Sequence, residues 1–339
     1  MSATNPTQVT PERIMQFAWA YATPLIIEAA IRNRIFDELD AGPKNADELH
    51  AATGAPARGV IAIANVLVGL NLLTRDSAGR YSLTPESAAF LVPSKPSFIG
   101  GLILHTSEHI IPQWLHLNEV VRTGIPVRTV NQEETGTAFF EELVLNIFPM
   151  SYAPAKALAE HLGLAAATAP ISVLDLAAGS GVWGIALAQS SPQVRVTAVD
   201  WAGVLPTTRK TAAKFGLTDR YSFSPGDLFE ADFGSGHQVA ILGHILHSEG
   251  EKRSRALLAK TFTALAPGAT IAVQEFLVNK DRTGPLNGLI FAVNMLINTD
   301  EGNTWSFEEI SDWLREAGFV NPRTLDSPGP SPLILATKP

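Results

Sequence analysis

The run Val173–Gly181 constrains the fold of this chain more than any other segment. Apolar residues surround Asp175, small residues lead to Gly179 and Gly181, and the apolar segment Val182–Gln189 follows. This order predicts a buried parallel strand, a tight turn and a helix, because glycine allows close backbone approach and a helix N-terminus presents free N–H groups. The segment is therefore expected to form the cradle of a nucleotide-containing ligand.

Strands and helices alternate from Ile171 onward. The second strand leads to Asp200, an acid placed to accept hydrogen bonds from ribose hydroxyls. Pro267–Gly268 is expected to end the helix before the fifth strand, and the last two strands are close enough to form an antiparallel hairpin around Ser327–Pro330. The fold class is thus α/β, an open, mostly parallel, Rossmann-like sheet with an antiparallel C-terminal hairpin. The expected strands are Ile171–Leu176, Val194–Val199, Tyr221–Ser224, Gln238–Leu242, Thr270–Phe276, Val320–Leu325 and Pro332–Thr337.

Two cofactors fit the cradle. Gly179, Gly181 and Gly184 match G-x-G-x-x-G, the dinucleotide fingerprint, which by itself is a weak signal. A carboxylate at Asp175 would repel a pyrophosphate but attract the cationic amino-acid end of a ligand. The pattern Asp-x-x-x-Gly-x-Gly resembles the first motif of the class I S-adenosylmethionine-dependent methyltransferases, with Ala177 in place of the usual first glycine. This resemblance and the terminal hairpin favour S-adenosylmethionine over NAD.

Length and composition limit the classes of function. The chain has 339 residues, more than one ordinary domain, and 46% of them are hydrophobic. A net charge of −8 disfavours a nucleic acid or an anionic membrane as partner. Without cysteine there is no disulfide, thiolate nucleophile or thiolate metal ligand. No N-terminal signal pattern is visible and the apolar helices look amphipathic, which predicts a cytoplasmic protein.

The first 97 residues are expected to form short helices and a β-wing, a winged-helix outline. Pro11 begins the first helix, Asn45–His50 carries a capping pattern, Ala57–Leu73 forms a third helix and Arg80–Leu83 contributes to the wing. The first helix presents apolar residues at helical spacing, namely Ile14, Phe17, Ala18, Tyr21 and Leu25.

The third helix distinguishes DNA binding from dimerisation. Its segment Arg58–Val68 offers one cation and an almost unbroken apolar surface, whereas phosphate and base contacts need Arg, Lys, Asn and Gln. A homodimer interface is therefore favoured over a winged-helix regulator. Residues 98–168 are expected to form a helical bridge that lines an acceptor pocket, and residues 169–339 a catalytic domain.

Ile241–Glu249 carries the most specific motif. It resembles the end of the fourth strand in the small-molecule O-methyltransferases related to plant caffeate and bacterial polyketide or phenazine enzymes. The resemblance covers nearly the whole chain. It implies an S-adenosylmethionine-dependent O-methyltransferase that yields S-adenosylhomocysteine and works as a homodimer without metal on an aromatic or polyketide-like hydroxyl. In this resemblance His247 is the general base, and Glu275 at the end of the fifth strand orients it.

The chemistry explains why a histidine suits this position. A phenol has a pKa of about 10 and is mostly protonated at neutral pH. An imidazole can accept the phenolic proton as the new C–O bond forms, which contributes roughly 10²–10⁴-fold to the rate.

The resemblance also assigns binding residues. Asp227 would bind the adenine amine, Leu228 would pack on the adenine ring and Trp201 would cover it, beside Asp175, Gly179, Gly181 and Asp200 in the same cofactor site. Met150 matches a methionine that packs on an aromatic acceptor. Four residues at i, i+3, i+4 and i+7 would share a helix face toward the acceptor or be ordinary core, namely Phe291, Asn294, Met295 and Asn298.

Three positions depart from the family pattern. Ser248–Glu249 replaces an aspartate–tryptophan pair, Gly243 replaces a frequent lysine, and Thr304 stands where a second carboxylate usually flanks the histidine. Alternatives therefore stay open: a methyltransferase-fold enzyme with altered chemistry (C- or N-methylation, hydroxylation, decarboxylation or a pericyclic reaction), an NAD-dependent oxidoreductase, or a winged-helix regulator.

Two further segments contain histidine. His105, Glu108 and His109 match the H-x-x-E-H pattern of zinc peptidases, but no third ligand stands at a motif spacing, so chance or acceptor-pocket lining is preferred. His237, between glycines and a strand, is expected to be a solvated loop residue.

Overall fold

The computed structural model describes residues 9–329 and 331–339. These residues fall into two compact units that meet in sequence at Ile111 and Pro112. The predicted turn residue Pro330 lies outside the described residues. Each unit is described by itself.

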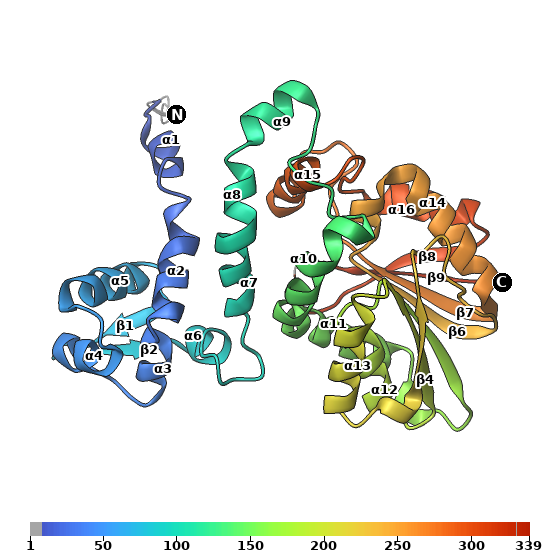
Figure 1. Cartoon of the computed structure of the whole chain (residues 1–339), viewed down its shortest axis with the longest axis horizontal. Coiled ribbons are helices and arrows are strands. Elements are labelled where there is room, and N and C mark those ends of the chain that lie inside the picture. The colour runs from blue at the N-terminus through green and yellow to red at the C-terminus, as the bar shows by residue number, and fades with distance from the viewer. Residues whose placement is uncertain (1–8, 330) are drawn as a thin grey trace, which may run out of the picture. The chain divides into compact units, whose positions relative to one another are not determined.

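The N-terminal unit is helical with a small two-stranded wing (Figure 1). The wing pairs β1 with β2 in antiparallel register, Leu73 opposite Leu83. The predicted winged-helix outline is confirmed, although the third helix of the prediction ends at Gly69 rather than Leu73. The elements are α1 (Glu12–Phe17), α2 (Ala22–Arg32), α3 (Ile35–Asp40), α4 (Ala46–Thr53), α5 (Ala57–Gly69), β1 (Leu73–Arg75), β2 (Tyr81–Leu83), α6 (Pro85–Phe90), α7 (Gly100–His105) and the π-helix η1 (Thr106–Ile110).

Local sequence signals explain these helices. The side chain of Asn45 accepts hydrogen bonds from the backbone N–H groups of Asp47 and Glu48, and Glu48 reaches back to the Asn45 N–H, so the predicted capping box of α4 is present. The helices enclose one core, in which Phe36 and Tyr81 are fully buried.

The helix α5 buries only one face within its own unit. Val60, Ala64 and Leu67 belong to the core, whereas Val66 is 40% exposed. The side of α5 that carries Val66 is therefore available to another molecule.

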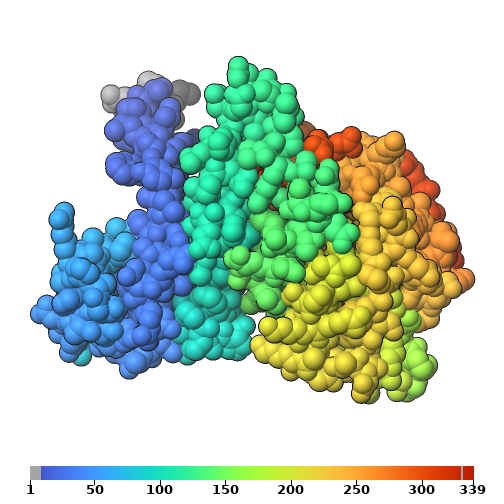
Figure 2. All heavy atoms as spheres, viewed as in Figure 1, coloured from blue at the N-terminus to red at the C-terminus, as the bar shows by residue number. Residues whose placement is uncertain are grey.

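The apolar face of α1 and α2 is exposed as well. Ile14, Met15, Phe17, Trp19 and Tyr21 all lie at the surface of this unit, each more than half exposed. The blue atoms of the α1 segment are visible at the surface in Figure 2. Such a cluster is unusual for a surface that faces only water. This exposed apolar cluster is suited to a protein–protein interface.

The segment Glu12–Arg32 corrects one sequence-based expectation. Its 21 residues are apolar enough to cross a membrane by length and composition, whereas the sequence had suggested no such span. The stretch is divided between α1 and α2 and carries charged residues at both ends. The core helix of a soluble protein and a signal sequence pass the same compositional test.

The C-terminal unit contains a seven-stranded sheet in the order β5-β4-β3-β6-β7-β9-β8. The first five strands in this order are parallel, and β9 and β8 are antiparallel, so the predicted sheet with a terminal hairpin is confirmed. The strands are β3 (Ile171–Leu176), β4 (Val194–Asp200), β5 (Tyr221–Pro225), β6 (His237–Gly243), β7 (Leu265–Gln274), β8 (Val320–Leu325) and β9 (Leu333–Thr337).

Helices cover both faces of this sheet (Figure 1). Alternate residues of β3 belong to opposite layers: Val173 packs with α11 and α12, whereas Leu174 and Leu176 pack with α14 and α16. The helices are α8 (Ile111–Trp114), α9 (Leu117–Thr123), α10 (Glu133–Asn146), α11 (Phe148–His161), α12 (Val182–Ser190), α13 (Leu205–Lys214), α14 (Leu246–Ala264), α15 (Leu286–Asn298) and α16 (Phe307–Glu316), with short 3₁₀ turns η2 (Leu164–Ala166) and η3 (Thr218–Arg220).

Two local expectations were wrong. The helix before β7 ends at Ala264, and Pro267–Gly268 lies inside the first part of β7 rather than at the helix end. His237 is not a solvated loop residue, because it opens β6, is 5% exposed and bonds Ser172 Oγ and the Phe233 carbonyl, both at 2.7 Å. A ring that satisfies both nitrogens inside the protein can be buried at low cost.

The exposed face of α1 and α2 generates a prediction about assembly. The double substitution Phe17→Asp, Tyr21→Asp should convert a dimer into a monomer, because it places two charges in an apolar interface. Size-exclusion chromatography with light scattering measures the change. Val121→Asp, at a 68% exposed apolar position of the other unit, is the control and should leave the dimer intact. A wild-type protein that elutes as a monomer would contradict the interface.

Candidate functional site

The centre of the site is a bond between neighbouring strand ends. His247 follows β6 and Glu275 follows β7, which are adjacent in the sheet. The Nδ1 atom of His247 lies 2.8 Å from Glu275 Oε2, and the His247 backbone N–H donates to Glu275 Oε1 at 3.2 Å. Since Glu275 holds Nδ1, the ring nitrogen Nε2 is the one left to accept a proton.

Burial makes this pair electrostatically strong. Glu275 is 1% exposed, and burial alone would raise the pKa of its carboxyl. The imidazoles of His247 and His244 and the hydrogen bond to His247 outweigh that effect, so the pKa of Glu275 is lowered. The carboxylate is therefore ionised and can stabilise a positive charge on the ring.

The turn that carries His247 is held by its carbonyls. The indole N–H of Trp305 donates to the Leu246 carbonyl, the Asn303 backbone N–H donates to the His247 carbonyl, and the Asn131 side chain donates to the Ser248 carbonyl. These three bonds come from two different segments of the chain. They fix the first turn of α14 before its backbone departs from helical geometry at Gly250.

His244 is a site residue that the sequence did not reveal. Its backbone has a positive φ of 61°, and its Nδ1 lies 4.0 Å from Glu275 Oε2. Burial lowers the pKa of His244 to about 4, so the ring is neutral near pH 7. Its position three residues before His247 was the only available signal.

Aromatic rings surround the base. The ring of Phe291 meets the His247 ring edge-on at 4.9 Å, and Phe291 lies 4.1 Å from the ring of Phe276. The ring of His244 lies 4.7 Å from that of Phe276. A flat aromatic molecule would find stacking partners beside the proton-accepting nitrogen.

The glycine turn after β3 forms the second half of the site. Gly179 and Gly181 have φ of 54° and 76°, as the sequence predicted for a turn that needs positive φ. The Thr208 hydroxyl donates to the Gly179 carbonyl and the Tyr221 hydroxyl to the Gly181 carbonyl, which hold the turn against α13 and β5.

Asp175 lies beneath this turn rather than at the surface of the crevice. It is 1% exposed, and its Oδ2 accepts the Gly184 backbone N–H at 3.0 Å. Within the described part of the chain, its Oδ1 is buried without a hydrogen-bond partner. Burial raises the pKa of Asp175 to about 7, against the opposing effect of the Gly184 hydrogen bond.

Asp200 links the two strand ends of the cradle. Its Oδ2 accepts the Gly179 N–H and its Oδ1 accepts the Trp201 N–H, both at 2.7 Å. Burial raises the pKa of Asp200 to about 6. Each oxygen keeps a second lone pair for a ligand hydroxyl.

The third acid, Asp227, follows β5. Its Oδ1 accepts the Phe229 N–H at 2.8 Å, and its Oδ2 lies 3.5 Å from Arg253. Leu228 is 7% exposed and belongs to the core beneath the sheet, whereas Phe229 is half-buried under the Arg253 guanidinium. The apolar neighbour of Asp227 that remains partly accessible is thus Phe229.

The helix α10 lies against the open end of the cradle. A Cβ atom built on Gly136 of α10 would come within 2.7 Å of the Trp201 ring, and one on Gly179 would come within 2.9 Å of Val144. The Trp201 ring also lies 5.9 Å from that of Phe140. Trp201 therefore packs on α10 in this structure.

Comparisons with known proteins agree with this geometry. Residues 155–320 match the model of an O-methyltransferase domain, and residues 15–93 match an O-methyltransferase dimerisation domain. The 3-hydroxy-5-methyl-1-naphthoate 3-O-methyltransferase of Streptomyces sahachiroi is 30% identical over 99% of this chain and 98% of its own. The chain belongs to the O-methyltransferase family.

Two further relatives extend the comparison. The tetracenomycin polyketide synthesis 8-O-methyl transferase of Streptomyces glaucescens is 29% identical and covers 97% of each chain. A protein of Nostoc punctiforme assigned as an O-methyltransferase has a solved structure with TM-score 0.88 and 27% identity, covering 99% of this chain and 100% of its own. The methyltransferase thus shares the full two-part architecture, including the N-terminal homodimerisation domain.

S-adenosylmethionine fits the cradle of this methyltransferase. A Cβ atom on Gly184 would lie 2.6 Å from the Tyr221 hydroxyl and 3.1 Å from Asp175, so no larger residue is accommodated there. The orphaned Asp175 oxygen and the bifunctional Asp200 carboxylate are acceptors that suit the ammonium and hydroxyl donors of this cofactor. When bound, S-adenosylmethionine supplies an electrophilic methyl group.

The predicted acceptor residues lie on two helices. Met150 lies in α11, and the four α15 residues share one face, as their spacing predicted. The Asn294 side chain accepts hydrogen bonds from the Trp114 indole and from Asn298. Met295 and Asn298 are buried, so Phe291 is the member of this face that directly contacts the base.

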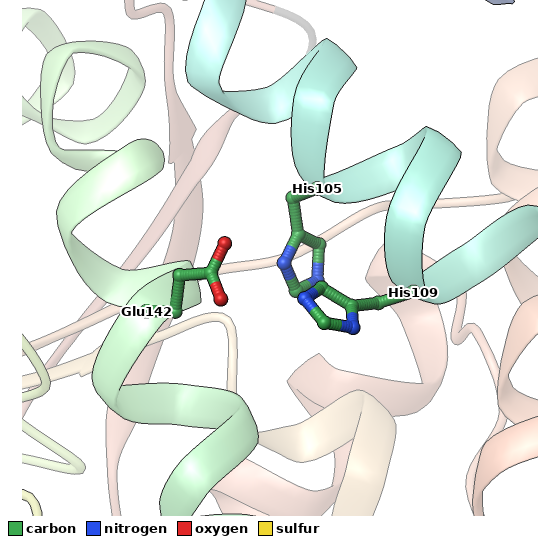
Figure 3. Close-up of side chains that lie close together, drawn as sticks. All are labelled: His105, His109 and Glu142. Carbon is green, nitrogen blue, oxygen red and sulfur yellow. The ribbon is translucent and has the colours of Figure 1, made fainter.

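Two groups of side chains have metal-ligand chemistry. His244, His247 and Glu275 present one ligand atom each, all within 4.8 Å of one another, which is also the acid–base centre described above. In the H-x-x-E-H segment, the rings of His105 and His109 lie side by side at 4.8 Å (Figure 3). Glu108 forms an ion pair with Arg32, so it is not placed as the base of a zinc peptidase.

The raised pKa values of Asp175 and Asp200 generate a prediction. Both groups bind a proton as the pH falls toward 5, whereas the hydroxyl and ammonium donors of the cofactor product favour ionised carboxylates. S-adenosylhomocysteine should therefore bind more tightly as the pH rises from about 5 to about 8, with proton release. Titration calorimetry in buffers of different ionisation enthalpy measures both quantities. Asp200→Asn should weaken binding by about 1–3 kcal/mol at pH 8 and flatten the pH dependence; an affinity independent of pH would contradict this role.

Proposed function

We propose that this methyltransferase transfers a methyl group to a hydroxyl of an aromatic or polyketide-like molecule, with His247 as general base. The observation that carries the proposal is the 2.8 Å bond between His247 Nδ1 and the buried Glu275. Two relatives that span the whole chain act, by name, on a hydroxynaphthoate and in the synthesis of a polyketide. The aromatic rings of Phe276 and Phe291 suit a flat acceptor.

The chain's own residues perform three tasks in this reaction. Glu275 holds the Nδ1 proton of His247, so that Nε2 faces the acceptor hydroxyl as a proton acceptor. As the acceptor oxygen bonds to carbon, its proton passes to Nε2, and the ionised Glu275 stabilises the imidazolium. The acids Asp175, Asp200 and Asp227, with the glycine turn, position the methyl donor, and this positioning supplies much of the acceleration.

The remaining assignments belong to the same proposal. Gly179, Gly181 and Trp201 serve the cofactor site, which Leu228 supports from the core, and Met150 and the α15 face serve the acceptor site. The chain divides into domains 1–97, 98–168 and 169–339. The protein resides in the cytoplasm and binds neither nucleic acid nor membrane, in keeping with its net charge of −8.

Substitutions at the pair test the base. His247→Ala should lower kcat by about 10²–10⁴-fold with S-adenosylhomocysteine affinity nearly unchanged, because the ring acts on the acceptor proton and not on the cofactor. Glu275→Gln should lower kcat by a smaller factor, since the imidazole of His247 remains. Steady-state kinetics with hydroxynaphthalenes and calorimetry with S-adenosylhomocysteine give the two quantities.

The exposed His116 provides the matched control. His116→Ala should leave kcat and cofactor affinity as in the wild type. Unchanged methylation in His247→Ala would mean that the acceptor ionises unaided. Bound cofactor without methyl transfer to any phenolic acceptor would instead favour the altered chemistries of this fold.

A further inference from the structure

The segment Val127–Asn131, here called the strap, runs along the acceptor side of the site. The Val127 N–H donates to the Ile297 carbonyl and the Val130 N–H to the Asn298 carbonyl, which ties the strap to the last turn of α15. At its other end the Asn131 side chain donates to Ser248, next to His247. Residue 128 is thereby held between the acceptor helix and the turn of the base.

Arg128 carries a positive charge in this segment and pairs with no carboxylate among the described residues. Its guanidinium lies over the ring of Phe139, with Cζ at 4.4 Å from the ring centroid. Its Nε and Nη2 atoms are buried and have no hydrogen-bond partner among residues 9–329 and 331–339, and no carboxylate of those residues pairs with it. Burial lowers the pKa of Arg128, yet a guanidinium stays ionised in proteins.

Arg128 is half-buried, and leaving its buried Nε and Nη2 without partners among the described residues is costly for a protein. The guanidinium presents two parallel N–H donors that match a carboxylate in fork geometry. The exposed Arg122, one helix earlier, shows the ordinary case, because it bonds both oxygens of Glu119. The strap thus carries an unused carboxylate-binding group in the segment that bonds both α15 and the turn of His247.

Two acceptor atoms lie on the same structural elements. Asn131 Oδ1 of the strap and Asn298 Oδ1 of α15 are buried and, within the described residues, also lack partners. The unpaired donors and acceptors that the strap and α15 carry are complementary to a ligand that has both an anionic group and hydroxyl groups. A purely apolar acceptor would leave all of them unsatisfied.

We propose that Arg128 binds a carboxylate of the methyl acceptor, so that this enzyme prefers hydroxylated aromatic acids over their neutral analogues. The inference rests on the proposed function, since it names the acceptor class of the same site. The methionyl carboxylate of the cofactor has the same chemistry. The acceptor is the assigned source because the strap bonds to α15 and the turn of His247, and not to the glycine turn.

The test compares 3-hydroxy-1-naphthoate with 3-hydroxy-1-naphthamide, which differs only in losing the charge. Calorimetry measures the binding of each to the full-length protein saturated with S-adenosylhomocysteine. We expect the wild type to bind the acid at least about tenfold more tightly than the amide. Arg128→Gln should abolish this preference by weakening the acid, Arg128→Lys should retain part of it, and the control Arg122→Gln should retain all of it.

The outcomes separate the two proposals. Equal binding of acid and amide to the wild type would overturn the carboxylate site while leaving an aromatic acceptor in place, and that result does not depend on whether any variant folds. Failure of the wild type to bind either compound would remove the acceptor class on which the inference rests. Loss of S-adenosylhomocysteine affinity in Arg128→Gln with an unchanged acid preference would assign Arg128 to the cofactor instead.

Discussion

The hydrogen bond between His247 and Glu275 is the interaction on which the proposed chemistry of this protein depends. The two residues are 28 positions apart and meet only because β6 and β7 are parallel neighbours whose carboxyl ends share one edge of the sheet. Their burial strengthens the bond, since the local dielectric is low. Bonds from Trp305, Asn303 and Asn131 hold the turn that carries the base, so its geometry is set before an acceptor arrives.

The same edge of the sheet collects the acids of the cofactor site. Asp175 lies near the carboxyl end of β3 and Asp200 is the last residue of β4, and burial raises the pKa of both carboxyl groups. Hydrogen-bond donors of a bound ligand would favour the ionised form of such a carboxyl group. Stability is given up here: Asp175 Oδ1 has no partner within the described chain, and a ligand-binding turn is the usual place for such a cost.

The acceptor side combines aromatic rings with unpaired polar atoms, whereas the cofactor side is built from acids and glycines. The aromatic rings of Phe276 and Phe291 can stack on an acceptor in several orientations. The unpaired polar atoms of the strap can fix one orientation through hydrogen bonds. Thr304 is fully buried at the position where the family pattern predicts a second carboxylate, and Glu275 is the acid that bonds His247. Thr304 supplies no carboxylate to this site. A carboxylate on the acceptor, bound by Arg128, would bring a negative charge to it.

The sequence by itself determined the parts whose causes are local. The apolar run at Ile171–Leu176 predicted β3 to the residue, and the expected terminal hairpin did the same for β8. The Asn45 capping box and the positive-φ glycines were readable from residue type, and the motif around His247 pointed to the histidine of the proposed base. Only the tertiary structure decided which residues lack partners and which side chains face each other. His244, His237 and Arg128 have ordinary sequence surroundings, and their roles arise from burial and from neighbours far along the chain. Burial and pairing depend on how helices and strands pack, and no local pattern encodes that arrangement.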